Sequence, residues 1–207
     1  IQYLKWVGNL LMFDPGESLA SQRPILSEVR PRIFVTGQLA IGAILVSLII
    51  AIPVGTISAI KQDSWVDYIM RIVSIGGLSM PSFWLATILI MVLSRYFGWL
   101  PPLEHKEPWD DLRSNLSQMF WPVLILGYAL SASVSRMTRS AVLEALREDY
   151  VRTARAKGLA SFRVNTRHVL RNALLPIVTI SAGQFGNLIG GAVVAETIFV
   201  LPGMGSY

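Results

Sequence analysis

The feature that most constrains this chain is a set of four long stretches without a charged residue, at positions 33–60, 72–94, 114–135 and 172–195. A helix of about 20 apolar residues crosses the ~30 Å hydrocarbon layer of a bilayer. Helices buried in a large soluble core would not require four uncharged stretches of this length. We therefore predict an all-α, polytopic helical membrane protein with four transmembrane spans, at about residues 37–60, 72–95, 117–138 and 172–195.

Composition agrees with a membrane protein and narrows the possible chemistry. Hydrophobic residues make up 53% of the chain and charged residues 15%, whereas a soluble domain carries about 25% charged residues. The absence of cysteine excludes disulfides and thiolate metal sites. The two histidines, His105 and His168, are far apart in the sequence, so a histidine-based metal or catalytic cluster is not expected. We predict no metal and no cofactor.

The charges between the stretches predict their orientation. The segment between the third and fourth stretches holds nine basic and three acidic residues. Basic loops stay on the cytoplasmic side of a membrane. We therefore expect residues 139–171 to be cytoplasmic, with residues 61–71 on the same side and residues 95–113 outside.

The ends of the chain suggest that it is a piece of a longer protein. It begins at Ile1 rather than at methionine, and it ends at Tyr207 shortly after a Pro-Gly pair. We expect residues 1–32 to form an external segment that is broken at Arg30-Pro31 and leads into a transmembrane domain over residues 33–207.

Two groups of residues inside the spans are candidates for a solute path. Pro81 should kink the second span, next to the hydroxyls of Ser79 and Ser82. In the last span, Gly186 and Gly190 lie at four-residue spacing, which allows another helix to approach closely. Ordinary helix packing explains both groups equally well, so the two interpretations stay open.

Glu196 lies at the end of the last span, where a charge is costly. It could simply reach the outer interface. Alternatively, it could help to hold the turn at Pro202 and Gly203, which would close the path.

The basic segment between the last two stretches has a helical pattern. It is longer than the 2–8 residues that usually connect neighbouring helices. Its pattern predicts a helix that stops at Gly158, followed by a second helix that resumes at Ser161. A solvated loop, a basic helix on anionic lipid and a docking helix for a cytoplasmic partner all remain possible.

Several separated motifs resemble one known family. Residues 149–159 (DYVRTARAKGL) and 167–176 (RHVLRNALLP) resemble the permease signature of binding-protein-dependent ABC importers, and most closely the dipeptide/oligopeptide/nickel branch. Residues 79–84, 98–102 and 196–205 are similar to other motifs of that branch. One departure is that Arg152-Thr153-Ala154 occupy the place of the general Glu-Ala-Ala triplet.

The resemblance implies a function. Such a chain is the transmembrane permease subunit of an ATP-driven importer and forms half of the path for peptides or a related small solute such as a nickel chelate. It carries no ATPase site of its own. The implied partners are a second homologous permease subunit, cytoplasmic ABC ATPase subunits, an external solute-binding protein and the lipid bilayer, but no nucleic acid. The implied location is the cytoplasmic (inner) membrane of a bacterium or archaeon.

Family members usually have six spans, so the resemblance implies that the first and the last lie outside this sequence. It also implies that the segment around Gly158 is a coupling helix that sits in a groove of the ATPase subunit. The implied coupling residues are Tyr150, Arg152, Thr153, Ala154, Arg155, Ala156, Lys157 and Gly158. Among them we expect Tyr150, Thr153, Ala154 and Ala156 to form the docking face.

The sequence argues against two other functions. A membrane enzyme would need catalytic residues in its spans, but the sequence has neither a His-Glu-x-x-His motif nor an aspartate within a span. An ion-driven transporter usually buries ionisable residues at mid-span, and the predicted spans contain none at that depth.

Overall fold

The computed structural model describes residues 7–8, 12, 15–18 and 22–206, with the side chains of residues 78, 190 and 191 left aside. Within this part of the chain every named element is helical, which agrees with the predicted all-α class. The elements are α2 (Ile25–Ile60), α3 (Trp65–Ser79), α4 (Ser82–Phe97), α5 (Leu112–Arg147), α6 (Asp149–Ala156), α7 (Ser161–Arg163), the π-helix η1 (Val164–Val169), α8 (Leu170–Gly191), α9 (Val193–Ile198) and the short 3₁₀ helix η2 (Met204–Ser206).

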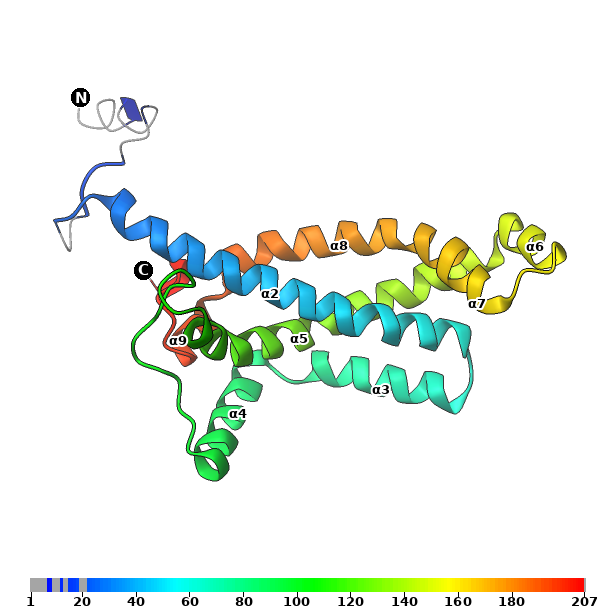
Figure 1. Ribbon diagram of the computed structural model, residues 1–207, viewed down its shortest axis with the longest axis horizontal. Coiled ribbons are helices and arrows are strands. Elements are labelled where there is room, and N and C mark those ends of the chain that lie inside the picture. The colour runs from blue at the N-terminus through cyan, green and yellow to red at the C-terminus, as the bar shows by residue number, and fades with distance from the viewer. Residues whose placement is uncertain (1–6, 9–11, 13–14, 19–21, 207) are drawn as a thin grey trace.

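Three long helices, α2, α5 and α8, lie side by side along the longest axis of the molecule, and α3 lies beside them (Figure 1). α2 and α5 run in the same direction, whereas α3 and α8 run back. We call the end that holds the α2–α3 turn, α6 and α7 the basic end. The opposite end holds α9, η2 and the start of α2.

Glycines allow α2 and α5 to approach each other closely. A Cβ atom added to Gly55 of α2 would lie 2.5 Å from the Cβ of Thr138 and 2.6 Å from the carbonyl oxygen of Ser135. A Cβ added to Gly127 of α5 would lie 2.6 Å from the side chain of Val46. Backbones in membrane helices pack this closely only where the side chains are small.

α2 and α5 extend beyond the spans predicted for them. Each has 36 residues, which corresponds to about 54 Å of helix against ~30 Å of hydrocarbon. α2 begins at Ile25 and continues through Pro31, so the break expected at Arg30-Pro31 is wrong, whereas the boundary of the external segment at residue 32 stays a prediction. α5 begins after Asp111, whose carboxylate accepts hydrogen bonds from the backbone and hydroxyl of Ser114, and these bonds lower the pKa of Asp111.

The second predicted span is not a straight helix. It is broken between α3 and α4, which meet at an angle of 92°. Pro81 explains the break, because it lacks a backbone donor and forces Met80 into an extended conformation, with φ −111° and ψ 127°. The kink that Pro81 predicts in the span over residues 72–95 is therefore present as a sharp bend.

Two helices in the described part of the chain, α2 and α5, are long and apolar enough to cross a membrane. A third span is added if α3 and α4 together count as one broken span. The fourth predicted span, residues 172–195, corresponds mainly to α8, which has 22 residues but is not among these candidates. The count of four spans stays a prediction.

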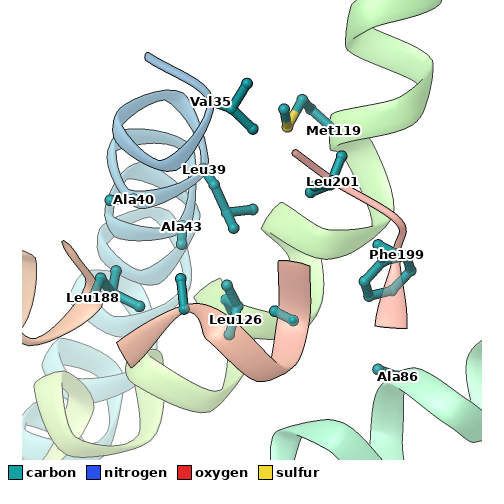
Figure 2. Packing of buried hydrophobic residues seen from close by; sticks show 12 residues of the cluster. Val35, Leu39, Ala40, Ala43, Ala86, Met119, Leu126, Leu188, Phe199 and Leu201 are labelled. Atoms are coloured by element: carbon teal, nitrogen blue, oxygen red, sulfur yellow. The ribbon is translucent and has the colours of Figure 1, made fainter. Parts of the chain in front are cut away.

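The buried core is divided between the two ends of the bundle. At the opposite end, Leu39, Leu126 and Leu188 bring α2, α5 and α8 together, and Phe199 and Leu201 cover them from the C-terminal turn (Figure 2). At the basic end, a second cluster joins α2, α5 and α8 to α6 and η1. Both ends are therefore packed independently.

The close approach of α2 and α5 can be tested with alanine. Gly55→Ala and Gly127→Ala should each destabilise the protein by about 1–3 kcal/mol, because the new methyl groups meet atoms of the facing helix. Gly183→Ala is the matched control, since no atom lies within 4 Å of its added Cβ and alanine favours a helix. In thermal unfolding in detergent, the first two variants should have lower melting temperatures than the control. Equal melting temperatures of all three would contradict the close packing of α2 and α5.

Candidate functional site

The basic end presents a short helix, α6, that is packed on one side and exposed on the other. Val151 is fully buried, and Ala154 is 6% exposed. Both contact the cluster that contains Val142 of α5 and Val164 of η1. α6 is therefore held firmly against the bundle although it has only eight residues.

Most of the residues predicted to couple to a partner lie on the exposed side of this element: Tyr150, Arg152, Thr153, Arg155, Ala156, Lys157 and Gly158. The prediction for Ala154 needs a correction. Its side chain packs into the core of its own chain, because a residue three positions after Val151 falls on the same helical face. Ala154 positions α6 and does not belong to its outward face.

Gly158 ends α6, as its place in the sequence predicts. Its φ of +77° lies in the left-handed region that glycine adopts without strain. The backbone N–H of Leu159 donates to the carbonyl of Ala154, and that of Gly158 donates to the carbonyl of Arg155. This pair of bonds is the Schellman arrangement, which stops a helix sharply.

The chain then continues as one unbroken helical rod from Ser161 to Gly191, as predicted for its first part. The unpredicted feature is the π-helix Val164–Val169 within this rod. π-turns inside helices are rare and are frequent at functional sites. Together, α5 and this rod bracket α6 between two long helices.

The basic end also contains an ion-pair cluster around Asp67 that the sequence did not reveal. Asp67 is fully buried and accepts hydrogen bonds from Ser58 of α2, from Arg71 of α3 and from Arg139 of α5. Its ion pairs with Arg71 and Arg139 measure 2.5 and 3.1 Å. We call this group the Asp67 cluster. It joins three helices through one carboxylate.

At the opposite end, Glu196 is also fully buried, so the interpretation that it reaches the outer interface is wrong. Thr36 of α2 donates its hydroxyl to Glu196 Oε1 at 2.5 Å, and the backbone N–H of Gly205 donates to Oε2 at 2.9 Å. The backbone N–H of Met204 donates in turn to the Thr36 hydroxyl at 2.9 Å. A Cβ on Gly203 would collide with the Glu196 carboxylate. We call this group the Glu196 clasp.

The turn that the Glu196 clasp holds is strained. Val200 has a φ of +55°, which is unusual for a β-branched residue. Its neighbours Phe199 and Leu201 are buried, at 1% and 2% exposure, and anchor the turn from both sides (Figure 2). Pro202 follows directly. Such strain persists only where the surrounding contacts impose it.

The candidate path residues are distributed over separate places. Ser79, Pro81 and Ser82 lie at the bend between α3 and α4, where Ser79 and Pro81 are exposed and Ser82 is half-buried. Gly186 lies on α8, and no atom lies within 4 Å of a Cβ added there. Gly190 lies on the same helix, and its surroundings are outside the description. Among the described residues, close approach of another helix is found at Gly55 and Gly127, between α2 and α5, and not at Gly186.

The described residues contain no group of three or more acidic or histidine side chains that could hold a metal ion. What the arrangement can do is mechanical. It presents a stiff, exposed element at one end and a clasped turn at the other, and long helices join the two.

Comparison with known proteins gives consistent relatives. Residues 51–207 match the family described as "Binding-protein-dependent transport system inner membrane component". The whole chain aligns with 68% of the length of the dipeptide transport system permease protein of Alkalihalophilus pseudofirmus, with 37% sequence identity. It aligns with 67% of the length of the di/tripeptide transport system permease protein of Pseudomonas aeruginosa, with 41% identity. An alignment of 99% of the chain with 66% of the length of the oligopeptide transport system permease protein of Bacillus subtilis has 40% identity. The chain thus spans about two thirds of the length of these relatives.

The Glu196 clasp predicts a stability effect. Thr36→Val keeps the shape of the side chain but removes the hydroxyl that bonds to Glu196 and Met204. A buried carboxylate that loses a donor should cost about 1–3 kcal/mol of unfolding free energy. Thr197→Val is the control, because that hydroxyl is exposed and bonds only to carbonyls of its own helix. Similar melting temperatures for the two variants in detergent would contradict the role of the clasp.

Proposed function

The chain belongs to the family of binding-protein-dependent transport system inner membrane components, as its motifs predict, and we propose that it is a permease subunit of an ATP-driven peptide importer. The observation that carries the proposal is the geometry of α6. It is short, anchored by Val151 and Ala154, ended by Gly158, and exposed on the side that faces away from the bundle. These are the properties that an element needs to transmit a push from a separate protein.

In this proposal, α6 docks in a groove of a cytoplasmic ATPase subunit. Tyr150, Thr153 and Ala156 make the close contacts, and the exposed cations of Arg152, Arg155 and Lys157 meet acidic groups of that partner. ATP binding moves α6, and the attached helices rock between inward-open and outward-open arrangements. Residues 139–171 are cytoplasmic in this arrangement.

The Glu196 clasp supports a gate at the outer end of the path. It fixes the turn around Pro202 and Gly203 to α2 through Thr36. A closed gate needs bonds that are satisfied in one state and exchanged in another, and a buried carboxylate with two donors provides such a switch. The bend at Ser79, Pro81 and Ser82 and the unfilled surface at Gly186 are the candidate linings of the path, which a second permease subunit completes.

The solute is a peptide in this proposal, because the three relatives named above carry dipeptide, di/tripeptide and oligopeptide transport in their names. An external solute-binding protein delivers it. An ion-driven mechanism receives no support from the buried carboxylates of Asp67 and Glu196, since each is already bonded within the chain.

The coupling role of α6 can be tested with two glycines of the same conformation. Gly158→Asp should lower ATP-coupled peptide uptake at least about tenfold while membrane insertion continues, because it disturbs the end of α6 and adds an anion among the cations. Gly98→Asp is the matched control: Gly98 also has a positive φ, of 62°, and open space around it, but lies at the end of α4. Normal uptake by the Gly158 variant, or an equal loss in both, would refute the assignment.

The gate can be tested by removing the charge of Glu196. Glu196→Gln should change either peptide uptake or basal ATPase activity, since the amide has only one acceptor oxygen for the two donors of the clasp. The control is Glu104→Gln, an exposed carboxylate of the loop before α5. If both activities of the Glu196 variant match those of the control in reconstituted complexes, the clasp is not a gate.

A further inference from the structure

The basic end contains a cavity of about 600 Å³ between α2, α3 and α5. Its polar wall consists of arginines and serines from all three helices, most notably Arg71, Arg136, Arg139 and Arg147 together with Ser58 and Ser140. Arginine presents a planar fork of N–H donors that matches the oxygens of a phosphate. The coupling and gating residues discussed above do not line this cavity.

Two of the arginines keep donors available for a ligand. Arg71 and Arg139 both bond to Asp67 through Nε and Nη2, so two guanidinium groups share one carboxylate. Their Nη1 groups take part in none of these bonds. The shared carboxylate fixes the orientation of both side chains, and Arg71 also forms an ion pair at 3.7 Å with the exposed carboxylate of Asp63.

The other two arginines carry no ion pair within the described part of the chain. Arg136 and Arg147 are exposed and lie on α5, at positions 11 residues apart that are three helical turns from each other. Glu144 and Glu148 also line the cavity. The lining itself therefore carries four guanidinium groups and two carboxylates, while Asp67 and Asp63, which both pair with Arg71, lie outside it.

One side of the cavity continues into an apolar surface. Ile75 of α3 belongs to the lining and is 53% exposed. Ile72 and Ile69 of the same helix are 69% and 54% exposed. Trp65 and Tyr68 lie near the start of this helix, and such residues are typical of the membrane interface. A ligand that fits both surfaces must be an anion with a hydrocarbon tail.

We propose that this cavity binds the phosphate group of an anionic phospholipid, with the acyl chains lying along Ile69, Ile72 and Ile75 of α3. Basic pockets between membrane helices recognise lipid headgroups in this way. Free inorganic phosphate shares the headgroup chemistry, but it would make no use of the apolar face of α3. The bound lipid bridges α3 and α5 at the Asp67 cluster, next to the start of α6.

The test measures lipid binding to the full-length protein in detergent. Phosphatidylglycerol or phosphatidylcholine with identical acyl chains is added, and native mass spectrometry measures how much of each lipid stays bound. Phosphatidylglycerol should be retained, and Arg136→Gln combined with Arg147→Gln should weaken its binding about tenfold or more, since each basic residue contributes to the attraction. Both arginines are exposed, so the fold should be kept, and thermal unfolding checks this.

Arg163→Gln combined with Arg167→Gln is the matched control, because these arginines are exposed at the same end but do not line the cavity. It should leave binding within about twofold of the unchanged protein. An equal loss in both double variants would show general attraction to charge and would overturn the site. Equal retention of phosphatidylcholine would also overturn it. Complete displacement by millimolar inorganic phosphate would assign the cavity to a free anion and refute the lipid.

Discussion

The close packing of α2 against α5 is the constraint on which the rest of the structure depends. The two helices are the longest in the chain and run in the same direction, so they define the axis to which the other elements attach. Gly55 and Gly127 bring their backbones together at two levels, where any side chain would separate them. The energy of dispersion contacts falls off steeply with distance, so the pair of helices stays rigid only while their backbones remain in close contact.

Each end of this pair of helices is completed by a buried carboxylate. At the basic end, Asp67 connects α2, α3 and α5 through Ser58, Arg71 and Arg139. At the opposite end, Glu196 connects α2 to the C-terminal turn. Burying an ionisable group is costly unless its bonds are satisfied, which makes the geometry at both ends specific. The two sites differ in composition: guanidinium groups hold Asp67, whereas a hydroxyl and a backbone N–H hold Glu196. The second arrangement is easier to exchange, because no opposite charge has to be separated.

The sequence predicted those features that depend on local pattern. The helical class follows from the uncharged stretches, and the stop at Gly158 follows from a glycine placed after a basic helical run. Features that depend on distant partners were missed. Asp67 and Arg71 looked like loop charges, because nothing in the sequence shows that Arg139, some 70 residues away, meets them. Ala154 looked like a docking residue until the structure showed what it packs against. Pro81 predicted a kink, but the angle of 92° depends on how α4 packs against α9.

The length of α5 explains how the two ends of the proposed importer can act together. It is one helix from Leu112, at the end of the bundle that holds α9, to Arg147, and the single residue Glu148 separates it from α6. A helix bends sharply where a proline or a π-turn provides a hinge, and Pro122 is the eleventh of the 36 residues of α5, so the part from Val123 to Arg147 contains no proline. In the proposed importer, a displacement of α6 would therefore also move this part of α5, and with it α2, which α5 contacts along much of its length. At the far end, Thr36 links α2 to Glu196 of α9 and to Met204 of η2, and Arg32 of α2 donates to the carbonyl of Gly203, so such a movement would load these bonds. In the proposed importer, transmission over this distance would need no chain of specific side chains, because two tightly packed helices would carry the movement to the clasp.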